Sequence, residues 1–142
     1  MSGDHTALEH TATARVRYGE TDQMGVVYHA NYLSFFEIAR TELIRLRGVA
    51  YRALEENGLR LMVTEAGLQY HSPGHYDDEL AITARLGESG PARVRFDYEV
   101  RRAGEEDVLV TGHTVLASID VDGRPCRLPP ELRELFKQAR DS

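Results

Sequence analysis

The chain lacks several features that would assign it to a common class of protein. Its 142 residues include one cysteine, Cys126, which excludes an intrachain disulfide and a cysteine-rich zinc site. No run approaches the about 18 apolar residues that a membrane-spanning helix requires. The polar first residues also lack the basic start and apolar stretch of a secretory signal. We therefore expect a protein of the reducing cytoplasm.

Repeats, low-complexity tracts and linkers are also missing, so the length predicts a single domain over residues 1–142. Lys and Arg number 17 against 23 Asp and Glu, which gives a net charge of −6. An acidic balance repels phosphate backbones unless the basic residues gather on one face. The composition therefore favours small-molecule chemistry over binding to nucleic acid.

Hydrophobic periodicity predicts one long helix, from Asn31 to Arg47, in which apolar residues recur at three- and four-residue steps. Asn31 suits the N-cap of this helix, and Gly48 suits the left-handed residue that ends it. Apolar residues also fall on its other sides, so we expect other structure to wrap the helix. The periodic apolar residues are Leu33, Phe36, Ala39, Leu43 and Leu46, and the apolar residues on the other sides are Tyr32, Phe35, Ile38 and Ile44.

Most of the remaining chain reads as strand. A short helix is expected over Ala50–Glu56, and a final helix opens at Pro129-Pro130 with Leu132, Leu135 and Phe136 on one face. The order of strand, long helix and further strands predicts an α+β fold, with an antiparallel sheet wrapped around one central helix. The predicted strands are Thr11–Tyr18, Leu59–Tyr70, Glu79–Leu86, Arg93–Arg101 (one face wet) and Val108–Val121 (covered on both sides).

The residues most suited to chemistry lie in the loop Gly19–Ala30 and just before it. Tyr18, Asp22 and His29 place a phenol, a carboxylate and an imidazole near a helix N-terminus, whose unpaired N–H groups can stabilise an oxyanion. A carboxylate there can attack a carbonyl or activate water. No G-x-S-x-G motif supplies a serine nucleophile. The competing interpretation is that Asp22 only forms a turn.

This segment resembles the hotdog-fold acyl-CoA thioesterases. Within them, it is similar to the 4-hydroxybenzoyl-CoA thioesterase branch, which includes the acyl-CoA thioesterases associated with the Tol-Pal envelope system. The resemblance implies a sheet around the long helix, assembly into dimers or tetramers, and active sites at the dimer interface. The matching residues are Val16–Tyr18, Thr21-Asp22, Gly25–Tyr32, Phe36-Glu37, Ala39–Glu42, Tyr70, Pro73 and Tyr76–Asp78.

The resemblance also implies roles for individual residues. Asp22 corresponds to the catalytic carboxylate, His29 and Tyr18 assist it, and the backbone N–H near His29 polarises the thioester carbonyl. Residues of the same motif are expected to shape the substrate site, namely Gly25, Val27, Tyr28 and Asn31.

Three charged residues outside this loop are further candidates for binding substrate. Glu37, on the long helix, either lines the acyl pocket or faces solvent or a neighbouring subunit. Arg93 and Arg95 either pair with coenzyme A phosphates or are simply solvated.

A metal site is not expected in this chain. His71 and His75 have the spacing of ligands on one helix face, but Pro73 and Gly74 between them prevent a helix. A turn at a strand end is the better interpretation.

The function that follows is hydrolysis of an acyl-CoA thioester to a free acid and CoA, with no metal or redox cofactor. Asp22 acts either as general base or as nucleophile, and the sequence leaves both open. Two other classes also remain open, a hotdog hydratase or dehydratase and a non-catalytic acyl-CoA binding protein.

Overall fold

The computed structural model describes residues 8–46, 54 and 56–141. Its elements include two longer helices and a short 3-10 turn, and the predicted helix Ala50–Glu56 lies mostly outside the described residues. None of the described helices is both long and apolar enough to cross a membrane. In chain order the elements are β1 (Glu9–Arg15), η2 (Tyr18–Glu20), α1 (Asn31–Leu46), β2 (Arg60–Tyr70), β3 (Glu79–Ser89), β4 (Arg93–Arg102), β5 (Val108–Ile119) and α3 (Pro130–Asp141).

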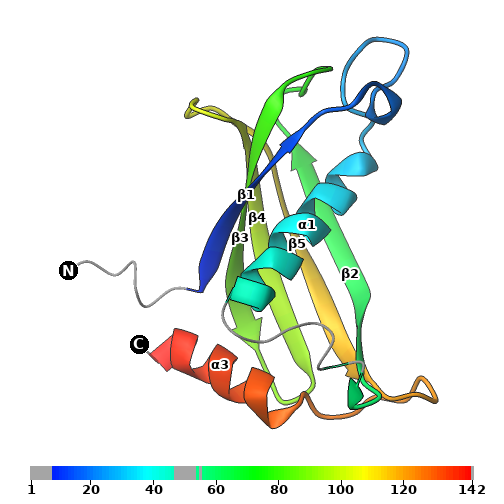
Figure 1. The fold of residues 1–142 in the computed structure, drawn as a ribbon, viewed down its shortest axis with the longest axis vertical. Coiled ribbons are helices and arrows are strands. Elements are labelled where there is room, and N and C mark those ends of the chain that lie inside the picture. The colour runs from blue at the N-terminus through cyan, green and yellow to red at the C-terminus, as the bar shows by residue number, and fades with distance from the viewer. Residues whose placement is uncertain (1–7, 47–53, 55, 142) are drawn as a thin grey trace.

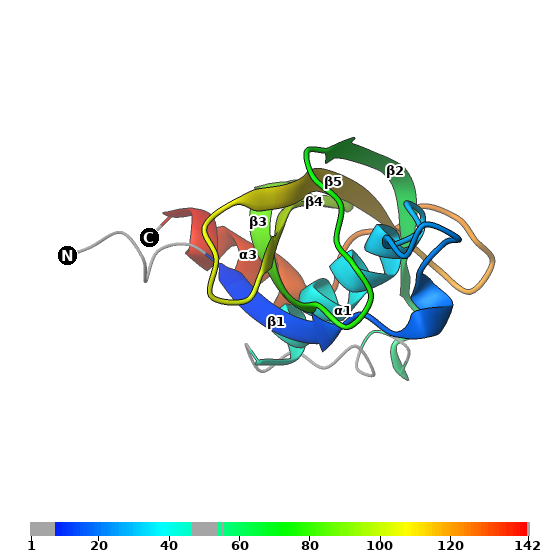
Figure 2. The ribbon, with the colours of Figure 1, turned by 90° about the horizontal axis from the view of Figure 1, so that it is seen from above.

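The strands form one antiparallel sheet in the order β1-β3-β4-β5-β2. Figure 1 shows α1 lying across the sheet, and the view from above in Figure 2 shows the strands curling around it. The predicted α+β architecture is therefore confirmed. Strands β1 and β2 are the two edges of the sheet.

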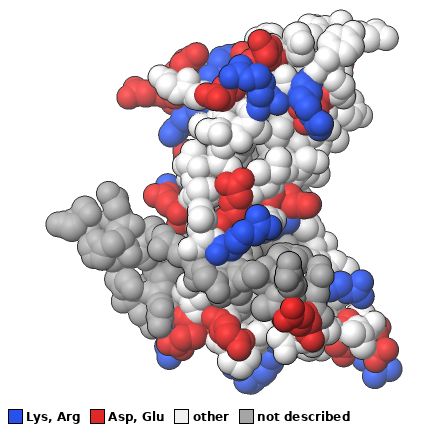
Figure 3. Space-filling view, in the orientation of Figure 1, with Lys and Arg blue, Asp and Glu red and all other residues white. Residues whose placement is uncertain are grey.

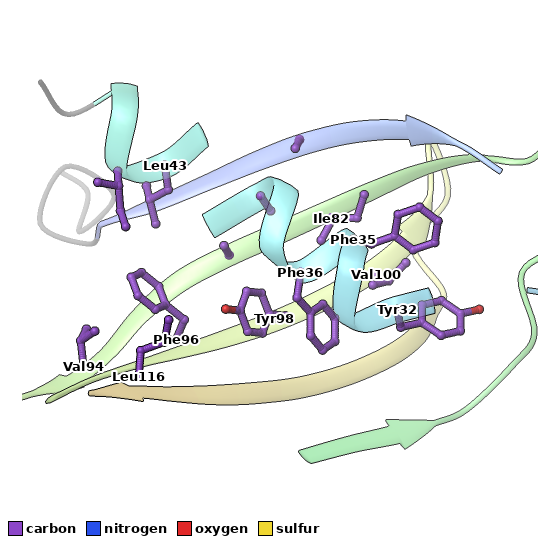
Figure 4. Close-up of a cluster of buried hydrophobic side chains, with 14 of the residues drawn as sticks. Tyr32, Phe35, Phe36, Leu43, Ile82, Val94, Phe96, Tyr98, Val100 and Leu116 are labelled. Carbon is purple, nitrogen blue, oxygen red and sulfur yellow. The ribbon is translucent and has the colours of Figure 1, made fainter. Parts of the chain in front are cut away.

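The central contact of the core joins α1 to the middle of the sheet. The ring of Phe36 stacks on that of Tyr98 in β4, with 4.2 Å between centroids and planes 2° apart (Figure 4). Beside it in β5, Gly112 leaves room for the phenyl ring, because an added Cβ would lie 2.7 Å from Cε2 of Phe36. Burying a phenylalanine side chain contributes roughly 1.5–3 kcal/mol.

A charged residue also lies in this core. Arg40, one turn after Phe36, is 6% exposed, and its Nη1 donates to Oη of Tyr98 at 3.0 Å. The same hydroxyl forms a second hydrogen bond, of 2.6 Å, with Oγ1 of Thr114 in β5. Nε of Arg40 has no hydrogen-bond partner among the described residues. The guanidinium therefore connects α1 to two strands through one tyrosine.

The prediction that other structure wraps α1 on all sides is wrong for a single chain. Leu33 and Ile38 are both 39% exposed, and Leu46 is 66% exposed. The sheet covers only one side of the helix, so the side chains on that side are buried and those on the opposite side are exposed to solvent. The buried residues are Tyr32, Phe35, Phe36, Ala39, Arg40, Leu43 and Ile44.

The strict alternation predicted for β4 is confirmed, with Val94, Phe96, Tyr98 and Val100 buried. Strand β5 differs from its prediction, because its outer row is only half-buried and so one chain does not cover it on both sides. The final helix meets its prediction, since Leu132 and Phe136 are buried, and the Phe136 ring packs edge-on against Phe96 at 6.2 Å.

The ends of four strands differ from their predicted positions, β4 by one residue only, since it ends at Arg102. Strand β1 ends at Arg15 because the chain then turns into η2. Strand β3 continues to Ser89, through a register shift after Leu86. Strand β5 ends at Ile119, where the side chain of Asp120 accepts the N–H groups of Asp122 and Arg124 and forms a turn.

Replacing Gly112 by alanine is expected to destabilise the fold by about 1–3 kcal/mol, because the new Cβ would overpack the contact with Phe36. The same Cβ would lie 2.6 Å from the backbone oxygen of Gly67, which cannot swing away. Chemical denaturation measures the free energy of unfolding. Gly90→Ala is the control, since its Cβ would meet no atom within 4 Å. Equal stability of the two variants would contradict the proposed packing.

Candidate active site

The loop between η2 and α1 is closed at its base by backbone hydrogen bonds. The carbonyl of Glu20 accepts the N–H of Tyr28 at 2.9 Å, and the N–H of Asp22 donates to the carbonyl of Val26 at 2.9 Å. The side-chain amide of Asn31 also donates to the Glu20 carbonyl, at 2.8 Å. Asn31 is the first residue of α1 and acts as a donor to the loop, so the prediction that it caps the helix is wrong.

Asp22 lies at the exposed tip of this loop. Its Oδ1 accepts the N–H of Met24 at 2.8 Å, and its backbone carbonyl accepts the N–H of Gly25 at 3.0 Å. Oδ2 makes no hydrogen bond within the described part of the chain. Asp22 is therefore a turn former, as one interpretation of the sequence held, and it still presents a carboxylate oxygen to solvent.

Gly25 completes the turn in the left-handed conformation, at φ +79°, which other residues adopt only with strain. A glycine between Asp22 and the helix N-terminus can serve either for its backbone conformation or for a close approach that a side chain would obstruct. The structure shows the first and not the second, because an added Cβ would meet nothing within 4 Å.

A second segment, residues 74–76, holds the loop from the other side. The N–H of Val27 donates to the carbonyl of Gly74 at 2.8 Å, and the N–H of Tyr76 donates to the carbonyl of Gly25 at 3.1 Å. The hydroxyl of Tyr32 on α1 accepts the N–H of Gly74 at 3.2 Å. Burial raises the pKa of this phenol, so it is neutral and can also donate. The loop is thus attached to the helix and to this segment.

An ion pair anchors residues 74–76 in turn. Nε of Arg102, the last residue of β4, donates to Oδ2 of Asp78 at 2.9 Å, and its Nη2 donates to the carbonyl of Pro73 at 2.8 Å. Desolvation raises the pKa of the Asp78 carboxyl. The hydrogen bond from the N–H of His75 and the bond and charge of Arg102 outweigh it, so this pKa lies below its usual 3.8.

Aromatic rings surround the start of α1. His29 is exposed, and its ring lies 4.4 Å from that of Tyr28 and 6.4 Å from that of Tyr70, centroid to centroid. The hydroxyl of Tyr70, the last residue of β2, donates to the backbone carbonyl of His29 at 3.2 Å. The structure therefore brings His29, Tyr28 and Tyr70 together at the helix N-terminus.

Tyr18 and Glu37 lie on two different sides of this loop. Tyr18 is 78% exposed, and its ring packs edge-on against that of Tyr76 at 5.8 Å. Glu37 is exposed and lines an open hollow of about 690 Å³ between η2 and the uncovered side of α1. The other residues around this hollow are Arg17, Gly19, Glu20, Asn31, Ser34, Phe35 and Ile38.

The structure does not bring Arg93 and Arg95 to the loop within one chain. Both lie near the start of β4, whereas Arg102, beside the loop, ends it, and a strand of this length spans about 30 Å. Arg95 already pairs with Asp97, with its Nη2 3.0 Å from Oδ1. Figure 3 shows that acidic and basic side chains are mixed over the face seen in Figure 1.

Metal ligands do not gather among the described residues, where no group of three His, Cys, Asp or Glu side chains could hold an ion. His71 instead shares a hydrogen bond of 3.1 Å with Oγ1 of Thr111, while Nδ1 of His75 lies 3.2 Å from Nη2 of Arg102. The segment between the two histidines forms bends and no helix, in agreement with the sequence prediction.

Sequence reasoning gave Tyr70 and Asp78 no role, although both belong to the matched motif, and it missed Arg102 entirely. The signal for Arg102 was available in the pairing of β3 and β4. A short turn between two strands places the start of one opposite the end of the other, and here Leu80 pairs with Arg102. That register puts the arginine beside Asp78.

Comparison of the sequence and the structure with known proteins finds several that this chain resembles. The profile of the family described as the thioesterase-like superfamily matches residues 16–136. The acyl-CoA thioester hydrolase YbgC of Escherichia coli O6:H1 is 31% identical over 87% of this chain and 92% of its own length. The acyl-CoA thioesterase YbgC of Haemophilus influenzae is 34% identical over 86% of this chain and 90% of its own length. The solved structure of the DHNA-CoA thioesterase of Staphylococcus aureus superposes with a TM-score of 0.89. The match covers 94% of this chain and 91% of that one, at 29% sequence identity.

Replacing Gly25 by alanine is expected to lower turnover more than stability. The left-handed backbone costs an alanine about 1–2 kcal/mol, and relaxing that strain would move the Asp22 turn. Turnover on an acyl-CoA and melting temperature measure the two effects. Gly123→Ala is a matched control. Gly123 also has φ +79°, and an added Cβ would also meet nothing within 4 Å, but it lies in the turn that follows β5 and not in the Asp22 loop. Equal turnover of the two variants would contradict a role for this loop.

Asp78→Asn is expected to lower the melting temperature at pH 7 and to lose that effect in acid. A carboxyl whose folded pKa is depressed stabilises the fold above its unfolded pKa, and this stabilisation is lost as the pH falls through the folded value. Melting curves between pH 7 and roughly pH 2.5 test this. Asp77→Asn is the control, because the side chain of Asp77 is 70% exposed. A difference that persists undiminished in acid would contradict the ion-pair interpretation.

Proposed function

Because the chain belongs to the thioesterase-like superfamily, we propose that it hydrolyses acyl-CoA thioesters to a free carboxylic acid and CoA. The observation that carries this proposal is the position of the Asp22 carboxylate. It lies on a loop closed by backbone hydrogen bonds, nine residues before the first residue of α1, Asn31. Such a site combines a carboxylate with backbone N–H donors, which are the two parts that acyl transfer requires. The two YbgC relatives, named for this reaction, support the same conclusion.

Asp22 is the catalytic carboxylate in this proposal. It either attacks the thioester carbonyl to give a mixed anhydride, which water then cleaves, or removes a proton from the water that attacks. In both routes water adds to the acyl carbon and the C–S bond breaks, releasing the CoA thiolate, which takes up a proton. Oδ2 of Asp22 is the available oxygen, because Oδ1 already accepts the N–H of Met24.

The N–H of His29 stabilises the oxyanion. The carbonyl of Tyr28 accepts the N–H of Asn31 at 2.9 Å, which orients the peptide between Tyr28 and His29. In a planar trans peptide, the N–H of His29 then points away from that bond, toward the outside of the turn. A donor held in this way loses no energy to reorganisation as charge develops on the carbonyl oxygen.

The remaining predicted residues take supporting roles. The imidazole of His29 protonates the leaving thiolate or orients Asp22, and Tyr18 assists from the outer side of η2. Gly25, Val27, Tyr28 and Asn31 shape the loop that receives the thioester. Glu37 lines the hollow beside the loop, where the acyl group is received.

Arg93 and Arg95 would reach a coenzyme A phosphate only at the active site of a neighbouring subunit, since they lie far from the loop of their own chain. We propose a homodimer or homotetramer on this ground and on the exposure of β2. This edge strand is exposed on both faces over Met62–Ala66, and Leu33 and Ile38 are open on α1. Unpaired edges and apolar surface of this kind favour pairing with a second copy.

The finer assignment, to the 4-hydroxybenzoyl-CoA thioesterase branch of the Tol-Pal-associated type, is also a proposal, supported by the motif Gly25–Tyr32. A single hotdog domain over residues 1–142 and a cytoplasmic location complete it. Hydrolysis assays over short, long and aromatic acyl-CoAs would identify the preferred acyl group.

Asp22→Asn is expected to lower turnover by about 10² to 10⁴, because asparagine keeps the turn but removes the basic charge. Acyl-CoA affinity should survive. Steady-state kinetics and equilibrium binding measure the two quantities, with Glu37→Gln as the comparison carboxylate. Near-normal turnover in Asp22→Asn would refute the assignment, and a loss confined to Glu37→Gln would move the catalytic role to the helix.

Light scattering at micromolar concentration is expected to give a mass that is a multiple of the 16.0 kDa of one chain. Exposed apolar residues on β2 and α1 are the physical reason. The mass of one chain at that concentration would contradict both the oligomer and the shared active site.

A further inference from the structure

The mechanism above leaves one hydrogen bond at the site without a role. It runs from the hydroxyl of Tyr70, at the end of β2, to the backbone carbonyl of His29, at 3.2 Å. The Tyr70 ring lies against the rings of Tyr32 and His29, with centroids 5.9 Å and 6.4 Å away. The hydroxyl therefore reaches the carbonyl from a side chain placed by aromatic contacts on two sides.

The carbonyl of His29 does not take part in the helical hydrogen bonding at the start of α1. In a regular helix the carbonyl of His29 would accept the N–H of Leu33, four residues on. Here that N–H donates to the carbonyl of Ala30, at 3.3 Å. Within the described part of the chain, Tyr70 is the recorded donor to the His29 carbonyl, so it determines the orientation of the peptide between His29 and Ala30.

Orienting this carbonyl also orients an N–H group. The described backbone contains no cis peptide bond, and in a trans peptide the C=O and N–H point in opposite directions. When Tyr70 holds the carbonyl of His29, the N–H of Ala30 points away from Tyr70. No backbone acceptor for this N–H is recorded among residues 8–46, 54 and 56–141.

We propose that Tyr70 is a positioning residue, whose hydroxyl holds the His29–Ala30 peptide so that the Ala30 N–H joins the His29 N–H in binding the thioester oxygen. This inference rests on the proposed function. The two donors are consecutive, and each is fixed through the carbonyl of its own peptide. Asn31 holds one of these carbonyls and Tyr70 holds the other.

Tyr70→Phe tests the proposal, because it keeps the ring and removes only the hydroxyl. Loss of an oxyanion donor costs about 10² to 10³ in kcat. A donor that is misaligned but still present should cost less, roughly tenfold in kcat, with KM changed less than about threefold. Tyr76→Phe is the matched control, since it makes the same chemical change at an exposed tyrosine whose hydroxyl has no hydrogen bond among the described residues.

A spectroscopic measurement separates positioning from a purely structural role. A ketone analogue of the substrate, with a methylene group in place of the thioester sulfur, keeps the carbonyl and cannot be hydrolysed. Its C=O stretch should move to lower wavenumber on binding to the wild type, and the shift should be smaller in Tyr70→Phe and unchanged in Tyr76→Phe. An unaltered kcat, a change in KM alone, or a lower kcat with an unaltered C=O band would each overturn the proposal.

A second measurement needs no variant and so does not depend on the folding of Tyr70→Phe. The amide proton of Ala30 should move downfield in NMR spectra when wild-type protein binds the ketone analogue, and not when it binds an analogue with no carbonyl. No downfield movement would overturn the inference. Different results would contradict the proposed function itself. These are a wild-type protein that hydrolyses no acyl-CoA, or an Asp22→Asn variant that keeps full activity.

Discussion

The burial of one side of α1 in the concave face of the sheet is the interaction that places every other part of the molecule. The aromatic rings on that side occupy the middle of the sheet, and Phe36 lies where Gly112 leaves space for it. Because this contact fixes both the position and the rotation of the helix, it also fixes the helix N-terminus. The proposed site depends on that terminus, so in this proposal apolar packing more than a helical turn away positions the reacting groups.

The loop between η2 and α1 is closed by its own backbone hydrogen bonds, and contacts with other elements attach it to the rest of the fold. Asn31 attaches the loop to α1, and Gly74 attaches it to the segment after β2. Arg102 then attaches that segment to β4. Each attachment uses a different element, so the loop keeps its geometry only when the sheet and the helix are both in place.

The sequence predicted the main elements and the position of the loop before α1, because both depend on local signals. Periodicity located α1 and β4, and the motif around Asp22 located the loop. Which side of α1 would be buried was not predictable in the same way, since Leu33 and Phe36 are both apolar and only the curvature of the sheet distinguishes them. Asn31 was assigned to a cap for a similar reason: its local preference is for capping, and its actual partner, Glu20, is brought close by the fold. The contacts of Tyr70 and Arg102 are likewise set by strand register.

Arg40 gives the helix a property that apolar packing alone does not. A guanidinium cannot lose its charge at any ordinary pH, so a buried one depends on the acceptors within its reach, and for Arg40 this is the hydroxyl of Tyr98. Sliding α1 by one turn, or rotating it by one residue, would leave the charge facing carbon, whereas a leucine at this position would tolerate several alignments. The side chains of Arg40, Tyr98 and Thr114 are joined through one hydroxyl group. A substitution at any of these three positions therefore alters the hydrogen bonding of the other two, so we expect their effects on stability to be coupled and not additive.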